Sequence, residues 1–339
     1  MTALLDTLRR SAGRPFDLLG VGECSLDLVY QIPVRLDQPL PDKTSSTAHE
    51  VLGGGQVATA CAAAARLGRR VRFIGAVGMD GAGQALLAEL ASDRVETAGV
   101  RRCLGTQTRT ALILSGESGE RSIIEWRDPA LSLPPDHVPI ELIQSCRVLH
   151  CDLFFPETSV RAAMRARESG LLVSIDLDRP GPLASELIAL SDLCVVSERF
   201  PSLLTGLDDP EAAALELSKR AMGRVIVTHG ERGCWLVTGS SIEQLPAFVP
   251  PQLVDTTACG DTFHAALIVG LLDAADAGEH DEEAALRLRC ALRAQRRLSS
   301  AEISDGEVAQ IEHKLCAFFV MCLGELPAAE VYSRAKDDK

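Results

Sequence analysis

Short runs of apolar residues recur along the chain and alternate with longer stretches in which apolar positions follow a helical period. Such runs are typical of strands that are buried on both faces of a sheet. We expect these strands at 17–22, 71–77, 147–153, 171–176, 193–196 and 224–228. The stretches between them predict helices at 56–67, 81–92, 157–169, 182–191, 209–222 and 260–273. This alternation favours an α/β fold with a doubly wound, mostly parallel sheet that is covered by helices on both faces.

Two segments interrupt the alternation. Residues 28–50 begin with LVYQIPVRL and continue with polar, proline-containing sequence, and residues 108–127 predict two strands joined by a turn at Gly116–Gly119. Ligands of a parallel sheet bind at the carboxyl ends of its strands, so a small β structure inserted there can act as a lid. We therefore expect an α/β core and a small β lid. The core comprises 15–27, 51–107 and 128–339, and the lid comprises 28–50 and 108–127.

Charge and composition exclude several classes of protein. The net charge of −13 argues against a nucleic-acid partner, which needs a basic face. The chain has no apolar run long enough to predict a membrane span, and its first residues do not follow the pattern of a secretory signal. The 11 cysteines are scattered without a CxxC pair, so we expect reduced thiols and no clustered metal site. These features predict a cytoplasmic protein without a membrane partner.

The most informative motif is DTTACGD at 255–261, which leads from an apolar strand end into an apolar helix. The small residues Ala258, Cys259 and Gly260 let the backbone approach a ligand closely. Free N–H groups in the first helical turn, together with the helix dipole, favour an anion such as a phosphate. A carboxylate at Asp261 could accept the proton of an attacking hydroxyl. From this stretch alone, the alternative is that the carboxylate only stabilises the helix start.

This motif resembles the C-terminal signature DTxGAGD of the ribokinase-like (PfkB) carbohydrate kinases. In that family the final Asp is the catalytic base, and the small residues before it form an anion hole. The resemblance therefore implies that Asp261 is the base and that Ala258, Cys259 and Gly260 supply amides to the hole. Ala258 and Cys259 replace the usual Gly and Ala of the family with other small residues.

A second segment, at 53–83, is similar to the N-terminal signature of the same family, and the resemblance covers roughly residues 15–280. It implies that Asp27 accepts hydrogen bonds from sugar hydroxyls and that Gly54 and Gly55 let the sugar lie against the backbone. A carboxylate suits a polyol because it accepts two donors at once. Thr59 stands where the family has Asn, which puts the substrate in question but not the fold.

Some of these positions allow a purely structural interpretation as well. For Asp27, the alternative is a solvated residue at a strand end. Gln56 and Arg127 are further candidates for contacts with the sugar or an anion, although a helix start and a surface position also explain them. His229 lies within a turn and His264 within an apolar helix, and structural roles suit both.

The segment VIVTHGERGCWLV at 225–237 predicts a strand, a turn and a second strand. It resembles the TxGxxG nucleotide-binding segment of the family, with Thr228, Gly230 and Gly233 in place, although a plain hairpin turn explains it too. Ser197 and Phe200 occupy the positions of the family's NxxE motif, so the glutamate associated with magnesium is missing. The resemblance implies ATP as phosphoryl donor and Mg²⁺ held mainly by ATP oxygens and water, and we assign no metal ligand in the protein.

Taken together, these features predict an ATP-dependent sugar kinase that phosphorylates a hydroxyl, most simply a primary one. Two alternatives stay open: a nucleoside or vitamin kinase on the same fold, and a non-catalytic protein that binds a sugar or a nucleotide. The chain has no P-loop motif, and its GxGxxS segment lacks the third glycine of a dinucleotide fingerprint. Lid strands of this family can pair across a homodimer. Residues 280–339 predict an atypical helical region within the core.

Overall fold

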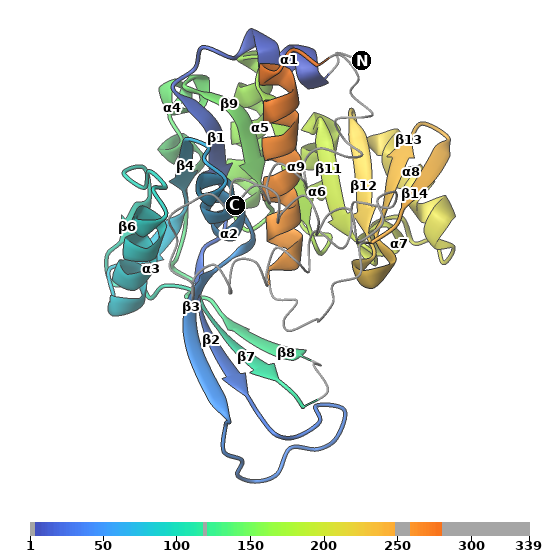
Figure 1. Cartoon of the computed structure of the whole chain (residues 1–339). Helices are drawn as coiled ribbons and strands as arrows, with labels where there is room; N and C mark the ends of the chain where they lie inside the picture. Colours follow the sequence, from blue (N-terminus) through green and yellow to red (C-terminus); the bar gives the residue numbers. More distant parts are fainter. Residues whose placement is uncertain (1–3, 118–120, 248–257, 280–339) are drawn as a thin grey trace, which may run out of the picture.

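The computed structural model describes residues 4–117, 121–247 and 258–279, and its centre is a large mixed sheet (Figure 1). Its strands are β1 (Phe16–Val21), β4 (Val71–Ile74), β9 (Cys146–Cys151), β10 (Leu172–Leu177), β11 (Leu193–Ser197), β12 (Arg224–Thr228), β13 (Cys234–Thr238) and β14 (Ser241–Leu245). They are arranged in the order β14-β13-β12-β11-β10-β9-β1-β4. Neighbouring strands run parallel from β4 to β12, whereas β13 and β14 add an antiparallel edge. The predicted doubly wound, mostly parallel sheet is confirmed.

Helices cover both faces of this sheet. One layer contains α1 (Leu4–Arg10), α2 (Gln56–Arg66), α3 (Gly81–Ser92) and α9 (Cys259–Asp276), and the other contains α4 (Ile140–Gln144), α5 (Pro156–Glu168), α6 (Ala184–Leu190), α7 (Phe200–Thr205) and α8 (Pro210–Arg220). Successive strand residues point to opposite faces, so Leu18 packs in the first layer and Leu19 in the second. Among the described residues, no helix has the length and apolar character needed to span a membrane.

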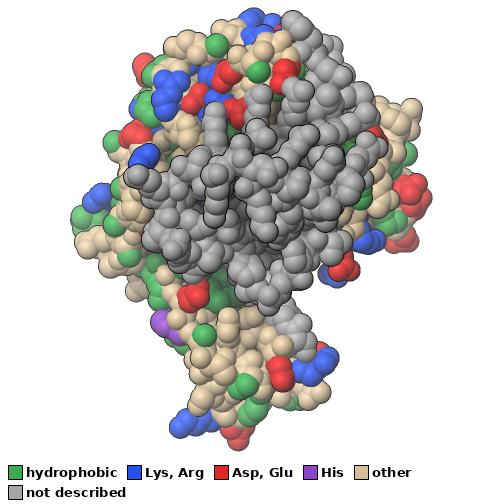
Figure 2. Space-filling model, in the orientation of Figure 1, with side chains coloured by type: hydrophobic (Ala, Val, Ile, Leu, Met, Phe, Trp, Pro, Cys, Tyr) green, Lys and Arg blue, Asp and Glu red, His purple; other side chains and the backbone are tan. Residues whose placement is uncertain are grey.

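A second, smaller sheet projects from the body (Figure 1). Its strands are β2 (Ser25–Gln31), β3 (Ala48–Gly54), β7 (Thr110–Ser115) and β8 (Arg121–Trp126), in the order β3-β2-β7-β8. Strands β7 and β8 are antiparallel, as the predicted hairpin requires, although part of its turn lies outside the described residues. In Figure 2, hydrophobic side chains are interspersed with acidic and basic ones over this sheet. We call it the β lid.

The β lid includes more residues than the sequence suggested. Strand β2 begins at Ser25 and β3 ends at Gly54, so each extends a few residues beyond the predicted segment 28–50. Pairing explains the extension, because β2 stays in register with β3 from Ser25 to Gln31. The division of the chain into a core and a lid stays a prediction. The expected helical region at 280–339 lies outside the described residues.

Other differences from the predicted elements are small. The expected strand at 71–77 consists of β4 and β5 (Ala76–Gly78), and β5 pairs with β6 (Arg101–Cys103) in a separate sheet. The strand is interrupted at Gly75, where a Cβ would lie 2.6 Å from the Phe73 ring. Sequence analysis also gave no element for α1, α4, α7 or β14, which are short and carry little periodic signal.

A network of buried charges joins the sheet to α9 at the end opposite the β lid. The guanidinium of Arg147 lies 3.4 Å from Asp17 and 2.7 Å from Asp276, and it donates to the carbonyl oxygen of Leu8. Its side chain is only 3% exposed. Arg69 adds ion pairs with Asp17 and Asp273. Three elements, β1, β9 and α9, are thereby held together by ion pairs in which the Asp17 carboxylate is buried, whereas Asp276 is 40% exposed.

Replacing Arg147 by Met should lower the free energy of unfolding by about 3 kcal/mol, because the Asp17 carboxylate that it helps to neutralise stays buried. Urea denaturation followed by circular dichroism measures this effect. The matched control is Arg220→Met, since Arg220 forms an exposed pair with Glu216 and its loss should cost less than about 1 kcal/mol. Equal effects of the two substitutions would show that the buried network contributes nothing special.

Candidate active site

The site lies where the winding of the main sheet reverses direction. In the main sheet, β4 lies beside β1 on one side and β9 lies beside it on the other. Loops that leave the carboxyl ends of two such strands diverge and open a crevice between them. Val21 and Cys151 are in register at this point, and Asp152 then accepts the backbone N–H groups of Glu23 and Phe154 at 2.8 and 2.9 Å. These bonds fix the buried carboxylate of Asp152 just beyond the end of β9.

Asp261 enters the crevice from the first turn of α9. The residue before this helix, Ala258, adopts a left-handed conformation with φ of 60°, which turns the chain sharply into the helix. Thr262 donates its hydroxyl to the carbonyl oxygen of Ala258 at 2.8 Å and stabilises that turn. Gly260 is exposed, and none of the described residues places an atom within 4 Å of the position of a Cβ there. With respect to the described part of the chain, the first turn of α9 is thus open on one side, as an anion site requires.

Asp27 approaches from β2, and two glycines at the end of β3 make room for it. Ser25 donates its hydroxyl to the Asp27 carboxylate at 2.6 Å. A Cβ on Gly54 would lie 2.1 Å from a carboxylate oxygen of Asp27. Gly55 has φ of +93°, and its Cβ would lie 2.6 Å from the Cα of Cys24. Only glycine fits at these two positions without moving the strand or the carboxylate.

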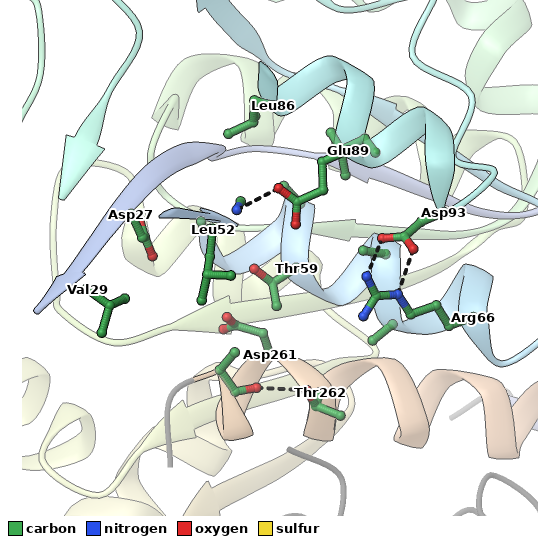
Figure 3. Close-up of a pocket in the computed structure, with 18 of the residues that line it drawn as sticks. Asp27, Val29, Leu52, Thr59, Arg66, Leu86, Glu89, Asp93, Asp261 and Thr262 are labelled. Atoms are coloured by element: carbon green, nitrogen blue, oxygen red, sulfur yellow. Dashed lines mark hydrogen bonds and ion pairs between the residues drawn. The ribbon is translucent and has the colours of Figure 1, made fainter. Parts of the chain in front are cut away.

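Asp27 and Asp261 line two adjoining cavities. The first, about 190 Å³ in volume, is also lined by Gly54, Gly55, Thr59 and Ala258, and Figure 3 shows Asp27, Thr59 and Asp261 around it. The second, about 360 Å³ in volume, shares Asp27, Gly55 and Asp261 with the first. Among the other residues that line it are Glu23, Gln56, Arg109, Phe154 and Asp176. The structure therefore brings the predicted sugar-binding residues and the predicted base together.

The carboxylates of the site influence each other. Burial, followed by the charges of Asp176, Glu23, Asp27 and Asp152, raises the pKa of Asp261 well above its usual value. Burial also raises the pKa of Glu23 to about 8, an effect that the guanidinium of Arg109 partly offsets from 2.6 Å. Asp152 has a pKa raised to about 7, again mainly by burial. A group here gains a proton far more readily than an exposed carboxylate does.

Sequence analysis missed part of this acidic cluster. Glu23, Asp152, Asp176 and Asp178 all lie at or just beyond the carboxyl ends of β1, β9 and β10. Their position after predicted strands was a usable signal, because the carboxyl ends of parallel strands meet at one edge. Arg109 was missed as well. It is buried between Glu23 and Glu125, so nothing in its local sequence marks it.

Gln56 and Arg127, the two weaker candidates, lie in different surroundings. Gln56 lines the second cavity. The guanidinium of Arg127 lies 4.1 Å from the centre of the Phe154 ring and donates to the carbonyl oxygens of Phe154 and Leu131, and Arg127 does not line either of the two cavities. A structural role therefore suits Arg127, because two of its donors bind backbone carbonyl oxygens and its guanidinium packs on an aromatic ring.

The predicted nucleotide-binding residues form a separate group. Ser197 and Thr228 are in register at the carboxyl ends of β11 and β12, and Gly230 and Gly233 bound the short turn that follows. Gly233 has φ of +87°, and a Cβ there would lie 2.0 Å from the carbonyl oxygen of Leu245. This group lines neither of the two cavities, but it borders the same edge of the sheet.

The described residues offer no protein-based magnesium cage. Phe200 is fully buried and carries no carboxylate, and the neighbouring Glu198 is paired with Arg232. Within the part of the chain that the structure describes, no group of three acidic, histidine or cysteine side chains could hold a metal ion. His229 packs on the Trp235 ring with centroids 4.2 Å apart, as suits a structural role.

Substituting Gly54 by Ala should lower kcat/KM for the predicted sugar substrate tenfold or more, because the new Cβ must displace the Asp27 carboxylate. Displacements of about 1 Å at a site can cost about a hundredfold in rate. The control is Gly81→Ala at the start of α3, where no atom lies within 4 Å of the added Cβ. Steady-state kinetics on both variants measures the difference. Wild-type kinetics in the Gly54 variant would contradict the close approach.

Comparisons with known proteins agree with this geometry. Residues 17–292 match the family model described as pfkB family carbohydrate kinase. A fructokinase of Solanum tuberosum is 31% identical over 243 residues, which cover 69% of this chain and 75% of that protein. A ribokinase of Bacillus subtilis is 31% identical over 271 residues, which cover 79% of this chain and 88% of that protein.

Solved structures share the fold at lower identity. A ribokinase from Thermotoga maritima matches with a TM-score of 0.67 and 22% identity, covering 88% of this chain and 99% of that one. An Arabidopsis thaliana ribokinase complexed with ribose and ATP matches with a TM-score of 0.66 and 23% identity, covering 88% of this chain and 98% of that one. These structures show that the arrangement of the main sheet and its helices is the ribokinase fold.

Proposed function

The chain belongs to the pfkB family of carbohydrate kinases and is a sugar kinase, and we propose that it transfers the γ-phosphoryl group of ATP to a primary hydroxyl of a neutral sugar, with Asp261 as base. The observation that carries this proposal is that Asp27 and Asp261, from different elements, line the same cavities. One carboxylate can then hold the sugar while the other faces the hydroxyl that reacts.

In the proposed reaction, the carboxylate of Asp261 accepts the hydroxyl proton while the sugar oxygen forms a bond to the γ-phosphorus. The bond from that phosphorus to the oxygen of the β-phosphate breaks, and ADP leaves. The raised pKa of Asp261 makes its ionised form a stronger base than an exposed aspartate. Phosphoryl transfer depends mainly on positioning and charge stabilisation, so the hydroxyl proton needs to be removed only late in the step.

Charge on the transferring group is stabilised at the start of α9. Backbone N–H groups of the first helical turn have no partner within the helix, and the helix dipole adds partial positive charge there. We assign this role to the turn formed by Ala258, Cys259, Gly260 and Asp261. The space beside Gly260 supports it, since no described residue lies within 4 Å of a Cβ there and a phosphate can approach the backbone closely.

The sugar is held between β2 and the start of α2. We assign Asp27 to accept its hydroxyls, Gly54 and Gly55 to provide the surface against which it lies, and Thr59 to a single hydrogen bond. The side chains that line the larger cavity are mostly polar, with Phe154 as its aromatic residue among those described. Such a lining favours a polyol over the flat apolar base of a nucleoside.

The nucleotide is assigned to the group at the ends of β11 and β12, formed by Ser197, Thr228, Gly230 and Gly233. Mg²⁺ supplies charge neutralisation on the phosphates when it is bound. The described residues do not form a cage for it, so we assign no protein ligand and derive no step from it. A homodimer formed through the β lid and a cytoplasmic location also stay predictions.

The deciding experiment measures ADP release from Mg-ATP with a panel of ketoses, aldoses and nucleosides, and identifies the product by mass spectrometry. We expect turnover with a neutral sugar such as fructose or ribose, and a product heavier by one phosphoryl group. Turnover with nucleosides alone would instead assign the chain to nucleoside phosphorylation. Silence across the panel, with ATP binding shown by calorimetry, would favour a non-catalytic binding protein.

A further inference from the structure

His264 contacts a carboxylate at the carboxyl end of a neighbouring strand. Its Nε2 lies 3.2 Å from Oδ1 of Asp176, the residue next to the end of β10, and the side chains are 4% and 9% exposed. Because a carboxylate only accepts, Nε2 carries the hydrogen. The Nδ1 of His264 has no hydrogen-bond partner among the residues that the structure describes. The one polar contact of this ring is therefore aimed at Asp176.

The position of this pair relative to Asp261 is what makes it notable. His264 follows Asp261 by one helical turn, and helical side chains lean toward the N-terminus, so residues three apart share a face. Asp176 lines the larger cavity together with Asp261. After burial, the charge of Asp176 raises the pKa of Asp261 more than the charges of Glu23, Asp27 and Asp152 do. One bond, made one turn after Asp261, thus fastens this end of α9 to β10 and holds a negative charge near Asp261.

Groups from several other elements surround the pair. His150 of β9 lies with its ring 5.0 Å from that of His264, and its Nδ1 is 3.2 Å from the hydroxyl of Ser174 in β10. Burial lowers the pKa of His150 to about 3, so it stays neutral. Gln56 of α2 hydrogen-bonds Asp176. The remaining charged groups that line the cavity are Glu23, Asp27, Glu125, Asp178, Arg109 and Arg179, and the charge of Asp152, outside the lining, also acts on Asp261.

We propose that His264 and Asp176 form a positioning pair that holds the first turn of α9, and with it the Asp261 carboxylate, at the geometry needed for proton transfer. The proposal rests on the proposed function only in naming what Asp261 does. A packing role alone does not explain the pair, because a buried carboxylate costs free energy unless it is hydrogen-bonded, and apolar residues would fill the same volume at lower cost. Burial opposes ionisation of Asp176, yet His264 lowers its pKa below the usual value.

The mechanical part of the proposal is tested without any turnover. We expect His264→Leu to increase amide hydrogen exchange across residues 259–264, measured by mass spectrometry, while exchange at the other end of α9 stays unchanged. His264→Gln is the matched variant, because its side-chain amide can still donate to Asp176. It should retain wild-type exchange in the first turn. Equal exchange in wild type and His264→Leu, or equal loss in both variants, would overturn the positioning role.

Kinetics then tests whether the pair acts on Asp261. In His264→Leu we expect kcat to fall tenfold or more with sugar and ATP KM values within about threefold, since a misplaced base affects the chemical step. His264→Gln should recover most of kcat. A loss confined to KM, or no recovery with Gln, contradicts positioning of the base.

The charge of Asp176 has a separate signature in the pH profile. A base must be ionised, so kcat/KM falls as pH drops through the pKa of Asp261, which is raised first by burial and then by the charge of Asp176. Asp176→Asn removes that charge while keeping an acceptor for His264, and the acidic limb should move to lower pH by about one unit. The control is Asp136→Asn, which removes an exposed carboxylate that lines neither cavity and should leave the limb in place.

These experiments separate two kinds of failure. A wild-type enzyme without sugar-dependent turnover would contradict the proposed function, and the exchange measurement would still decide the positioning role. Turnover in the wild type with an unshifted limb in Asp176→Asn would contradict the electrostatic part alone.

Discussion

Asp261→Asn should lower kcat for sugar phosphorylation by about a thousandfold, within the range of 10² to 10⁴ that a general base contributes. Asn has nearly the same shape but cannot accept the hydroxyl proton. Binding should change little, because the backbone of the first turn of α9 is unaltered. Steady-state ADP release with saturating sugar and Mg-ATP measures the loss, and calorimetry of ATP binding gives the control.

For the same substitution we also predict the effect on thermal stability. Because the pKa of Asp261 is raised in the folded protein, its ionised form destabilises the fold above the pKa of the unfolded chain, near 3.9. Replacing it by a neutral amide should therefore leave the thermal midpoint at neutral pH unchanged or raise it. A variant that retains turnover within about threefold of wild type would refute the assignment of Asp261 as base. A variant with a strongly lowered midpoint would assign Asp261 to structure instead.

Asp27→Asn should lower kcat/KM for the sugar by about a hundredfold. The carboxylate offers two acceptors to sugar hydroxyls, and hydrogen bonds to charged groups contribute about 1.5–3 kcal/mol each, so losing one and weakening the other removes about 3 kcal/mol. Each 1.4 kcal/mol corresponds to a factor of ten. The effect should appear in the sugar KM, since Asp27 lies in the β lid and not beside the proposed nucleotide group.

The ATP KM of the same variant is the internal control for Asp27→Asn, and it should stay within about threefold of wild type. Ser25→Ala offers a matched comparison, because it removes only the donor that orients the Asp27 carboxylate. We expect a smaller loss there, about tenfold, with the same direction. A loss in the ATP KM as large as that in the sugar KM would contradict a role confined to the sugar.

The two carboxylates differ in how far their local sequence revealed them. Asp261 stands in a motif whose small residues at 258–260 and final carboxylate suit a helix start, so its place at the start of α9 followed directly. Asp27 was recognised through the resemblance, and its contact with Gly54 depends on the antiparallel register of β2 and β3. His264 was read as a structural residue, and only its distance to Asp176 suggests more.

Local pattern determined most of the framework of this protein. Each predicted strand and helix of the main layers exists within a few residues of its expected bounds, apart from the break at Gly75, because burial on one or two faces imposes a period that one sequence can display. The small residues at 258–260 likewise carry their meaning locally, since they permit a close backbone approach at a helix start.

Tertiary structure decided what surrounds the site. Glu23, Asp152 and Asp176 follow three different strands, and they face Asp261 because β1, β9 and β10 are neighbours in the sheet. Strand order depends on how whole layers pack, which no short segment encodes. The raised pKa of Asp261 has the same origin, because it depends on burial and on charges distant in sequence. Arg127 shows that tertiary contacts can also keep a candidate residue out of the site. Its guanidinium packs against Phe154 and Phe155 and lines neither cavity, because only the folded chain brings these side chains together.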